Sequence, residues 1–364
     1  MKNLWSRWLA GWRYFGRGLV NGLSPMVGKE MRGRTRGWRP VFLLTVYLGV
    51  LAAGMTGYLW LTLGRATFIN PQVGLNLYSF FVLGLVMLLA FIAPATSASA
   101  ISGERERRTY DLLLVTNASP TGIILGKWLA STIYFVYLAI AALPVMALVF
   151  LFGGVPLANL GLVLLVALLT ALGYGALGLA LSAVLKRTQA ATISAVVVVF
   201  LLIFVSLGIA VIAASTSQAR PLPYPPPMGE PYRPPGSPWY VYLSPLTGLG
   251  SVLPAEGMNV GAGIPLLGSI LNELLRGIQG GPYGVEYAYK MGYVYGYPGG
   301  YPGLPGSAPE ITGLAAWSPW ARFALYQAAL TALCLAVAVL AITPVKPWTA
   351  WLARRKARAA HRPA

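Results

Sequence analysis

Residues 102–120 read SGERERRTYDLLLVTNASP and carry the densest mixture of positive and negative charge in the chain. This hydrophilic stretch lies between two apolar segments, at 78–101 and 124–152, that are each long enough to cross a bilayer. Non-helical, charged backbone between two such segments is expected only outside the hydrocarbon region. The stretch therefore marks a loop at a membrane surface, and the rest of the chain can be placed around it.

The composition is that of a membrane protein. Of the 364 residues, 57% are hydrophobic and 10% are charged, and the mean hydropathy is +0.65. The formal net charge of +18 also occurs in proteins that bind nucleic acid. Here, however, the basic residues cluster beside apolar segments, which fits the positive-inside rule better and predicts no nucleic-acid partner. The single cysteine, Cys334, excludes a disulfide framework.

Six apolar segments each have room for the roughly 20 residues of a spanning helix. They cover residues 41–63, 78–101, 124–152, 157–185, 189–214 and 320–343. We therefore predict an all-α integral membrane protein with six transmembrane helices. The predicted parts are an N-terminal region at 1–39, helices one to five within 40–214 with the charged loop at 102–120, an extracytoplasmic loop at 215–319, helix six at 320–343 and a basic tail at 344–364.

The basic residues predict the orientation of these helices. If every segment crosses once, residues 1–39, the Lys186–Arg187 pair, the tail and the loop at 102–120 all fall on one side. The positive-inside rule makes that side cytoplasmic. Both termini are therefore predicted to be cytoplasmic, with the chain integral to the plasma (inner) membrane.

The N-terminal region is basic and aromatic. It contains nine Lys or Arg residues and a single acid, Glu30. Trp5, Trp8, Trp12 and Phe15 recur at helical spacing on one face, which is typical of an amphipathic helix in the membrane interface. A basic disordered tail is the alternative, although such tails rarely carry aromatic residues at this spacing.

The long segment at 215–319 has an unusual composition. Residues 220–238 are rich in proline and residues 280–306 in Gly, Tyr and Pro, which favours a flexible lid over a folded binding domain. Between them, 239–253 and 261–278 are moderately apolar but too short to cross. We predict short helices there, lying at the outer leaflet or dipping into it.

Small and weakly polar residues gather on two of the predicted helices. They include Pro94, Thr96, Ser97 and Ser99 in the second and Gly175 in the fourth. Such surfaces let helices approach closely in lipid. We predict helix packing within the chain, with a subunit interface or translocation path as the alternative. Pro94, together with Pro144 in the third segment, also predicts bends.

The spanning segments lack the groups that power transport or catalysis. No Asp, Glu, Lys, Arg or His is expected at mid-membrane depth, and Arg322 lies near a segment end. Ion-coupled carriers usually need such groups, so energy for uphill transport would come from outside this chain. We predict no catalytic residue, no metal site and no bound cofactor. The sequence GIILGKW at 122–128 has the wrong spacing for a phosphate loop.

The charged stretch contains two local signals. Leu112 to Val115 form an apolar patch that is too short to span and needs lipid or a protein partner to cover it. Ser119 and Pro120 form an N-cap and first-turn pair, which predicts that the next helix begins at Pro120.

Three stretches resemble the ABC-2-type permeases, which are membrane subunits of ATP-binding-cassette transporters. They read SPMVGKEMRGR at 24–34, ISGERERRTYDLLLVT at 101–116 and ASPTGIILGK at 118–127. The middle one is the most specific, because it is similar to the family's glutamate-rich segment followed by leucines. The resemblance covers residues 24–214. It implies an amphipathic elbow helix before six spanning helices and a cytoplasmic coupling helix, between helices two and three, docked on a separate ATPase.

Carried over residue by residue, the resemblance implies contacts with that ATPase. The expected contacts are Glu104, Glu106, Arg107, Thr109, Asp111, Leu112, Leu113 and Leu114. Lys29, Glu30 and Arg32 in the elbow region would support them or contact lipid. ATP and Mg²⁺ would bind to the partner, and the chain would pair with itself or with a related permease.

The function expected from the sequence is thus the permease subunit of an ABC transporter, working in export. A membrane-anchored scaffold that moves no substrate is the alternative. An integral-membrane enzyme using Glu256 or Glu273 of the outer loop is less well supported, because no cluster of acids, histidines or metal ligands accompanies them.

Overall fold

The computed structural model describes residues 28, 38–63, 71–110, 119–152, 158–218, 239–250, 252–253 and 318–343. Several predicted features lie outside the described residues. These are nearly all of the amphipathic N-terminal region, the apolar patch at 112–115, most of the loop at 215–319 and the basic tail at 344–364.

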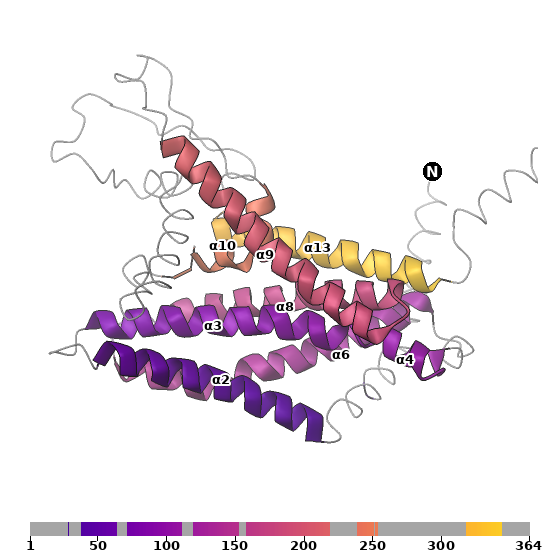
Figure 1. Cartoon of the computed structure of the whole chain (residues 1–364), viewed down its shortest axis with the longest axis horizontal. Helices are drawn as coiled ribbons and strands as arrows, with labels where there is room; N and C mark the ends of the chain where they lie inside the picture. The colour runs from indigo at the N-terminus through magenta and orange to yellow at the C-terminus, as the bar shows by residue number, and fades with distance from the viewer. Residues whose placement is uncertain are drawn as a thin grey trace, which may run out of the picture.

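All regular structure in the described part of the chain is helical (Figure 1). The long helices are α2 (Trp38–Leu63), α3 (Pro71–Ser97), α6 (Pro120–Ala141), α8 (Ala158–Val184), α9 (Thr188–Gln218) and α13 (Pro319–Ile342). The short elements are α4 (Ser102–Glu106), α7 (Leu143–Phe150), the 3₁₀ helix η1 (Trp239–Leu243) and α10 (Pro245–Gly250). The prediction of an all-α protein is confirmed.

Among the described residues, six helical stretches are long and apolar enough to cross a membrane, and each overlaps one of the six predicted segments. They cover Pro40–Leu61, Val73–Glu106, Pro120–Phe150, Asn159–Val184, Thr188–Ser206 and Trp320–Ile342. The third consists of α6 and α7, which are separated at Ala142 next to Pro144. The break follows because Pro144 has no N–H to donate to the preceding turn. Pro94, by contrast, lies inside α3.

Helices α3 and α8 form the centre of the bundle. In their spans 61% and 56% of the most apolar window is buried, against 22% in α2 and in α9 and 28% in α13. Helices α3, α6, α9 and α13 all pack on α8. Figure 1 shows α3 and α8 running along the bundle with α13, while α9 crosses it obliquely.

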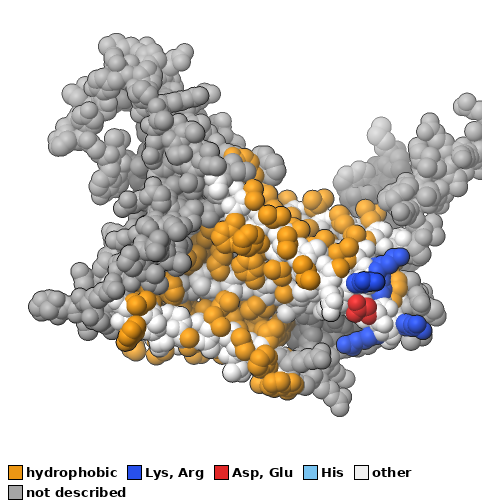
Figure 2. All heavy atoms as spheres, in the orientation of Figure 1, with side chains coloured by type: hydrophobic (Ala, Val, Ile, Leu, Met, Phe, Trp, Pro, Cys, Tyr) orange, Lys and Arg blue, Asp and Glu red, His pale blue; other side chains and the backbone are white. Residues whose placement is uncertain are grey.

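The outer helices expose large apolar side chains. On α2 these are Trp38, Val41, Phe42, Val46, Val50 and Trp60, and on α9 they are Ile193, Val197, Phe200, Leu201, Phe204 and Val205. Figure 2 shows apolar side chains covering the length of the bundle, with Lys, Arg and acidic side chains gathered at one end. Apolar surface of this extent is unfavourable in water and suits contact with lipid tails. The chain is therefore an integral membrane protein.

Small residues bring α3 and α8 close together. A Cβ atom placed on Gly178 would lie 2.5 Å from the carbonyl oxygen of Pro94, and one on Gly175 would lie 2.7 Å from the ring of Phe135 and 3.5 Å from the Ser97 hydroxyl. Glycine at these positions allows the backbones to approach, as in other lipid-embedded helix pairs. Three of the predicted small or polar residues, Pro94, Ser97 and Gly175, thus lie in this contact.

The segment that holds η1 and α10 packs into the bundle at the start of α13, the end opposite α4 (Figure 1). The Gln327 amide and the Tyr174 hydroxyl both donate to the carbonyl oxygen of Leu243, at 3.1 and 2.9 Å. The Arg322 guanidinium lies 5.2 Å from the centre of the Tyr242 ring and is buried there. Burial against Tyr242 keeps Arg322 among the helices, near the start of α13 as the sequence predicted.

Replacing Gly178 by Ala should loosen the centre of the bundle. The added methyl group meets the Pro94 carbonyl oxygen, and overpacking of this kind costs about 1–3 kcal/mol. The measurement is the thermal unfolding midpoint of the detergent-solubilised protein, which should fall. Gly161→Ala on the same helix is the matched control, since no atom lies within 4 Å of its Cβ position and Ala favours a helix. An equal fall in both variants would contradict a specific contact at Gly178.

Candidate functional site

Helix α4 lies at the charged end of the bundle, just after α3 (Figures 1 and 2). Residues 98–101 form a turn between the two helices. The turn still donates in helical fashion, from the Gly103 N–H to the Ser99 carbonyl and from the Arg105 N–H to the Ile101 carbonyl, both near 3 Å. Because of this turn, α4 follows α3 as a separate element.

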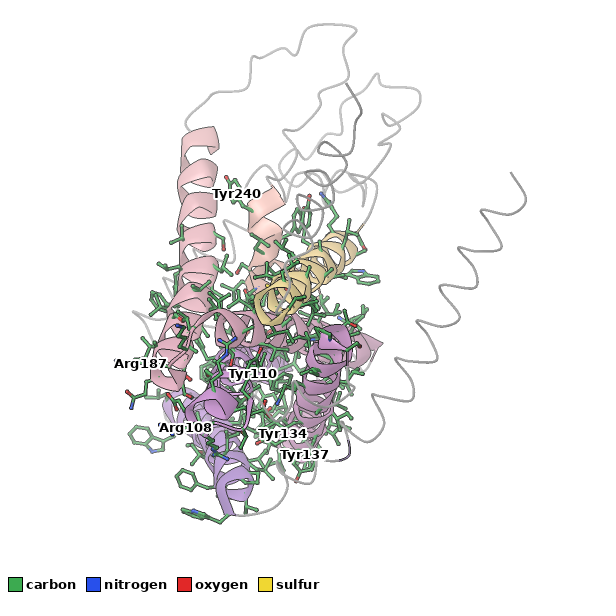
Figure 3. The ribbon with its side chains drawn as sticks, turned by 90° about the vertical axis from the view of Figure 1, so that its right-hand side faces the viewer. Arg108, Tyr110, Tyr134, Tyr137, Arg187 and Tyr240 are labelled. Atoms are coloured by element: carbon green, nitrogen blue, oxygen red, sulfur yellow. The ribbon has the colours of Figure 1, made fainter. Side chains whose placement is uncertain are left out.

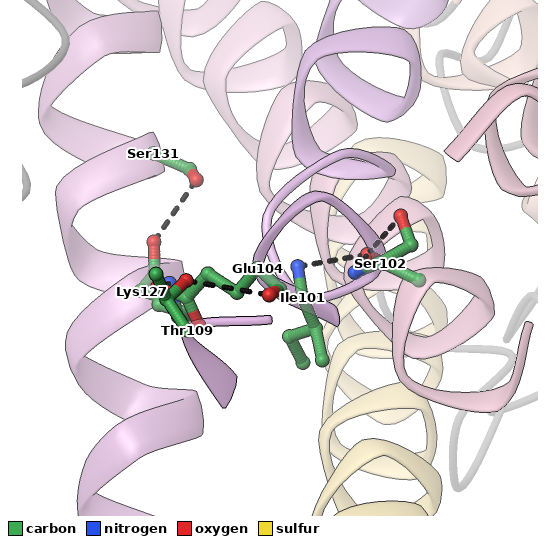
Figure 4. A network of polar contacts seen from close by, with 7 residues as sticks. Ile101, Ser102, Glu104, Thr109, Lys127 and Ser131 are labelled. Atoms are coloured by element: carbon green, nitrogen blue, oxygen red, sulfur yellow. Dashed lines mark hydrogen bonds and ion pairs between the residues drawn. The ribbon is translucent and has the colours of Figure 1, made fainter. Parts of the chain in front are cut away.

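The start of α4 is fastened to α8. Its first backbone groups have no side-chain cap of their own. Instead, the Ser182 hydroxyl of α8 accepts from the N–H groups of Ile101 and Ser102, at 2.9 and 3.0 Å (Figure 4). The Ser102 and Ser182 hydroxyls also lie 3.2 Å apart. Both serines are buried, so this contact satisfies helix-end donors that have little access to water.

The first glutamate of α4 forms an ion pair with α6. The Lys127 ammonium lies 2.8 Å from Oε1 of Glu104 (Figure 4). Only 1% of the Lys127 side chain is exposed, against 24% of Glu104. Removing two charges from water is costly unless they are paired, and here each is the other's partner. The second carboxylate oxygen of Glu104 has no hydrogen-bond partner among the described residues.

The second glutamate of α4 caps α9. The Thr188 N–H donates to Oε1 of Glu106 at 2.8 Å, and the Thr188 hydroxyl donates to Oε2 at 2.7 Å. Thr188 is the first residue of α9. A carboxylate at a helix N-terminus satisfies unpaired N–H groups and interacts favourably with the helix dipole. Glu106 therefore joins α4 to α9 although its side chain is exposed.

A weaker contact reaches α13. The Tyr110 hydroxyl donates to the carbonyl oxygen of Ile342, near the end of α13, at 3.4 Å. The Arg105 guanidinium lies 4.9 Å from the centre of the Tyr110 ring. Figure 3 views the bundle from this end, where Tyr110, Arg108 and Arg187 lie on the face turned to the viewer. We call the contacts of residues 101–110 with α6, α8, α9 and α13 the α4 junction.

The predicted ATPase contacts divide into three groups. Glu104 and Glu106 bind groups within the chain. Arg107 and Thr109 are exposed next to them. The others lie outside the described residues: Asp111, Leu112, Leu113 and Leu114 of the charged stretch and Lys29, Glu30 and Arg32 of the elbow region. Their contact with an ATPase stays a prediction.

Arg108 has a φ of 57°, in the left-handed region that non-glycine residues rarely adopt. Its N–H donates to the Arg105 carbonyl, and the next N–H, of Thr109, donates to the Glu104 carbonyl at 2.9 Å. A residue with positive φ after a helix ends it and turns the chain away. The end of α4 is thus set by the backbone of Arg108.

The predicted N-cap of the next helix is confirmed. The Ser119 hydroxyl accepts from the Gly122 N–H at 3.1 Å, and Pro120 is the first residue of α6. This cap fixes where α6 starts, and so places Lys127 two turns further along, facing α4.

The remaining predicted residues lie on α3 or beside it. The Thr96 hydroxyl bonds back to the Ile92 carbonyl, and the exposed Ser99 hydroxyl bonds to the Thr96 carbonyl. Pro94 and Ser97 belong to α3 as well, and Gly175 of α8 faces them. All of these residues lie directly before the α4 junction. Their role in a translocation path stays a prediction.

Lys127 and Ser182 are the residues that sequence reasoning missed. In the sequence, Lys127 belongs to the stretch at 122–128, whose spacing does not fit a phosphate loop, and to the family-like stretch at 118–127. A lone lysine in an apolar helix, 23 residues after an acid in the preceding loop, is the signal that was available. Among the described residues no group of three His, Cys, Asp or Glu is placed to hold a metal ion.

Comparison with known families gives one match. A family model described as "ABC-2 family transporter protein" matches residues 26–247. The match covers more than half of the chain and includes the whole α4 junction except its contact with α13. A search of curated proteins finds no match.

Breaking the ion pair should destabilise the protein. Glu104→Gln removes the carboxylate charge that faces the buried ammonium, and Lys127→Met removes the ammonium that faces the carboxylate. Each should cost about 2–4 kcal/mol, toward the low end for a buried pair because Glu104 is partly exposed. The double variant should recover most of the loss. The measurement is a double-mutant cycle on the free energy of unfolding in detergent.

Arg107→Gln is the control for this cycle, since Arg107 is exposed on the turn that follows α4. Surface changes of this type usually lie within about 0.5 kcal/mol. A loss in the double variant equal to the sum of the two single losses would mean that Glu104 and Lys127 do not interact.

Proposed function

The chain belongs to the ABC-2 transporter family, and we propose that it works in export, driven by ATP hydrolysis on a separate ATPase subunit. Membership makes it the permease subunit of an ABC transporter, a membrane transport component; that ATP is hydrolysed on a separate subunit is part of the proposal. Direction of transport and the route of coupling are the parts that we propose.

The α4 junction is the observation that carries the proposal. Within ten residues, 101–110, the chain binds α6 through Glu104, α8 through Ser102 and α9 through Glu106. These are hydrogen bonds and an ion pair at 2.7–3.0 Å, which fix direction as well as distance. A force applied at α4 would therefore move several spanning helices together.

The surface next to α4 is where we propose that the ATPase binds. Arg107, Arg108 and Thr109 are exposed there. In the sequence they run directly into Asp111 and the leucines at 112–114. Charged groups at the edge of an apolar patch are typical of a protein interface. In this proposal residues 107–114 contact the ATPase, and Glu104 and Glu106 pass its movement on to α6 and α9.

The few charges within the described spans support an external source of energy. Lys127 is paired with Glu104 near one end of its span, and Arg322 lies near the start of α13 against Tyr242. Neither belongs to a chain of ionisable groups that could relay protons or ions through the bundle. The work of transport would then come from the ATPase.

The basic residues support a cytoplasmic position for α4. Arg105 and Lys186 line one pocket beside α4, and Figure 3 shows Arg108 and Arg187 at the same end of the bundle, where basic side chains gather in Figure 2. The positive-inside rule assigns such an end to the cytoplasm, where ATP is available. The exposed apolar faces of α2 and α9 leave room for lipid or for a second permease, either a copy of this chain or a relative.

A coupled assay tests this function. The chain is purified in mild detergent from its native membranes, and the ATP hydrolysis of the associated ATPase is measured. Glu104→Ala combined with Glu106→Ala detaches α4 from α6 and α9, and should lower hydrolysis at least tenfold while ATPase still co-purifies. Glu106→Gln alone should produce part of this loss at little cost in stability, since Glu106 is exposed.

Gly161→Ala is the control, because Gly161 lies at the other end of α8 and no atom lies within 4 Å of where its Cβ would be. Unchanged hydrolysis in the double glutamate variant would contradict coupling through α4. Absence of any ATPase from the wild-type preparation would favour the scaffold.

A further inference from the structure

An open pocket of about 700 Å³ lies at the α4 end of the bundle. Its walls come from three elements of the α4 junction: α4, the last turn of α8 with the residues after it, and the last turn of α13. Each of these elements ends a candidate membrane span or follows one directly. The pocket is therefore at the level where the apolar bundle meets its charged end.

One side of the pocket is cationic. Arg105 and Lys186 line it, and Arg187 follows directly in the chain. Glu106 lines it too and keeps its negative charge, although Thr188 donates to both of its carboxylate oxygens and so fixes it on α9. The Arg105 guanidinium lies over the Tyr110 ring, which orients it without neutralising it. Two cations against one carboxylate leave the lining positive.

The other side is apolar and open. Val184, Leu340 and Ala341 line it. Val184 is 54% exposed and Leu340 is 41% exposed, although both belong to spanning helices. Apolar side chains at this depth face acyl chains. The pocket thus combines two cations with an adjoining apolar wall.

We propose that this pocket binds an anionic phospholipid of the leaflet on the α4 side. The phosphate lies between Arg105 and Lys186, where both donate charge-assisted hydrogen bonds. An acyl chain follows Val184 and Leu340 into the hydrocarbon. Basic pockets between helix ends favour anionic headgroups for this reason. A soluble anion would use the cations and leave the apolar wall without a ligand.

Occupancy of the pocket has a consequence for the α4 junction. A lipid held there contacts α4, α8 and α13 at once, and Ser182 and Tyr110 already join residues 101–110 to α8 and α13. Anionic lipid would stabilise the junction in its present arrangement. This binding does not depend on the proposed export function or on an ATPase.

Lipid retention tests the proposal on the full chain. Purified protein is reconstituted into vesicles of equimolar phosphatidylglycerol and phosphatidylcholine and re-extracted, and the retained lipids are counted by native mass spectrometry. The wild type should retain phosphatidylglycerol in preference to phosphatidylcholine. Each cation near an anionic lipid contributes roughly a fivefold preference, so Arg105→Gln with Lys186→Gln should lower the preference by roughly 25-fold.

Two further variants sharpen the result. Arg107→Gln with Arg187→Gln removes two cations from the same end but outside the pocket lining, and should change the preference less than about fivefold. Ala341→Phe keeps every charge but fills the pocket, and should lower retention of phosphatidylglycerol on its own. This variant also tests the proposal if the charge variants fail to fold.

Three outcomes would overturn the proposal. One is equal retention of both lipids by the wild type. Another is an equal loss in the pocket pair and the control pair, which would mean that only the overall charge matters. The third is displacement of the lipid by glycerol phosphate at equal concentration, which would assign the pocket to a soluble anion.

Discussion

A lipid bilayer offers no hydrogen bonds to a peptide backbone, and this constraint determines the form of the described chain. Every described crossing is helical, because only a helix pairs its N–H and C=O groups within one segment. The difficulty arises where a helix ends near lipid. At the start of α4 the Ser182 hydroxyl accepts from Ile101 and Ser102. One buried side chain from α8 thus allows the chain to leave α3 and begin a separate helix.

The same constraint explains why the two glutamates of α4 bind neighbouring helices. Glu104 lies beside an apolar helix bundle, where an unpaired carboxylate would be costly, and Lys127 supplies its counter-charge. Glu106 lies one half-turn further and meets the N-terminus of α9, which lacks backbone acceptors for its first N–H groups. Each carboxylate satisfies a need of a different helix. Local electrostatic requirements therefore link α4 to two spanning helices that are far apart in sequence.

Close packing completes this arrangement. Gly175 and Gly178 let α8 approach α3 until backbone atoms are nearly in contact. Helix α8 also carries Ser182 and ends at the pocket beside α4. Tightly packed helices of this kind transmit strain instead of absorbing it. The central helix pair and the α4 junction together tie the charged end to the core of the bundle.

The sequence by itself determined the class of structure and the approximate path of the chain. Apolar runs of spanning length, the Ser119–Pro120 start signal and the break near Pro144 are local properties, and each acts over a few residues. The resemblance in residues 101–127 indicated the family for a similar reason. What the sequence did not determine was the partner of each polar group. Glu104 was expected to contact a separate protein, and Lys127 received no role.

The tertiary structure decided those partners. Glu104 and Lys127 are 23 residues apart, Glu106 and Thr188 are 82 apart, and Tyr110 and Ile342 are 232 apart. Such pairs depend on how α4, α6, α9 and α13 pack around α8, and hydrophobic periodicity carries no information on that packing. Composition predicted a charged end to an apolar bundle. The folded structure shows that the glutamates at this end bind α6 and α9, because a charge near lipid pairs with a group that is close in space and not in sequence.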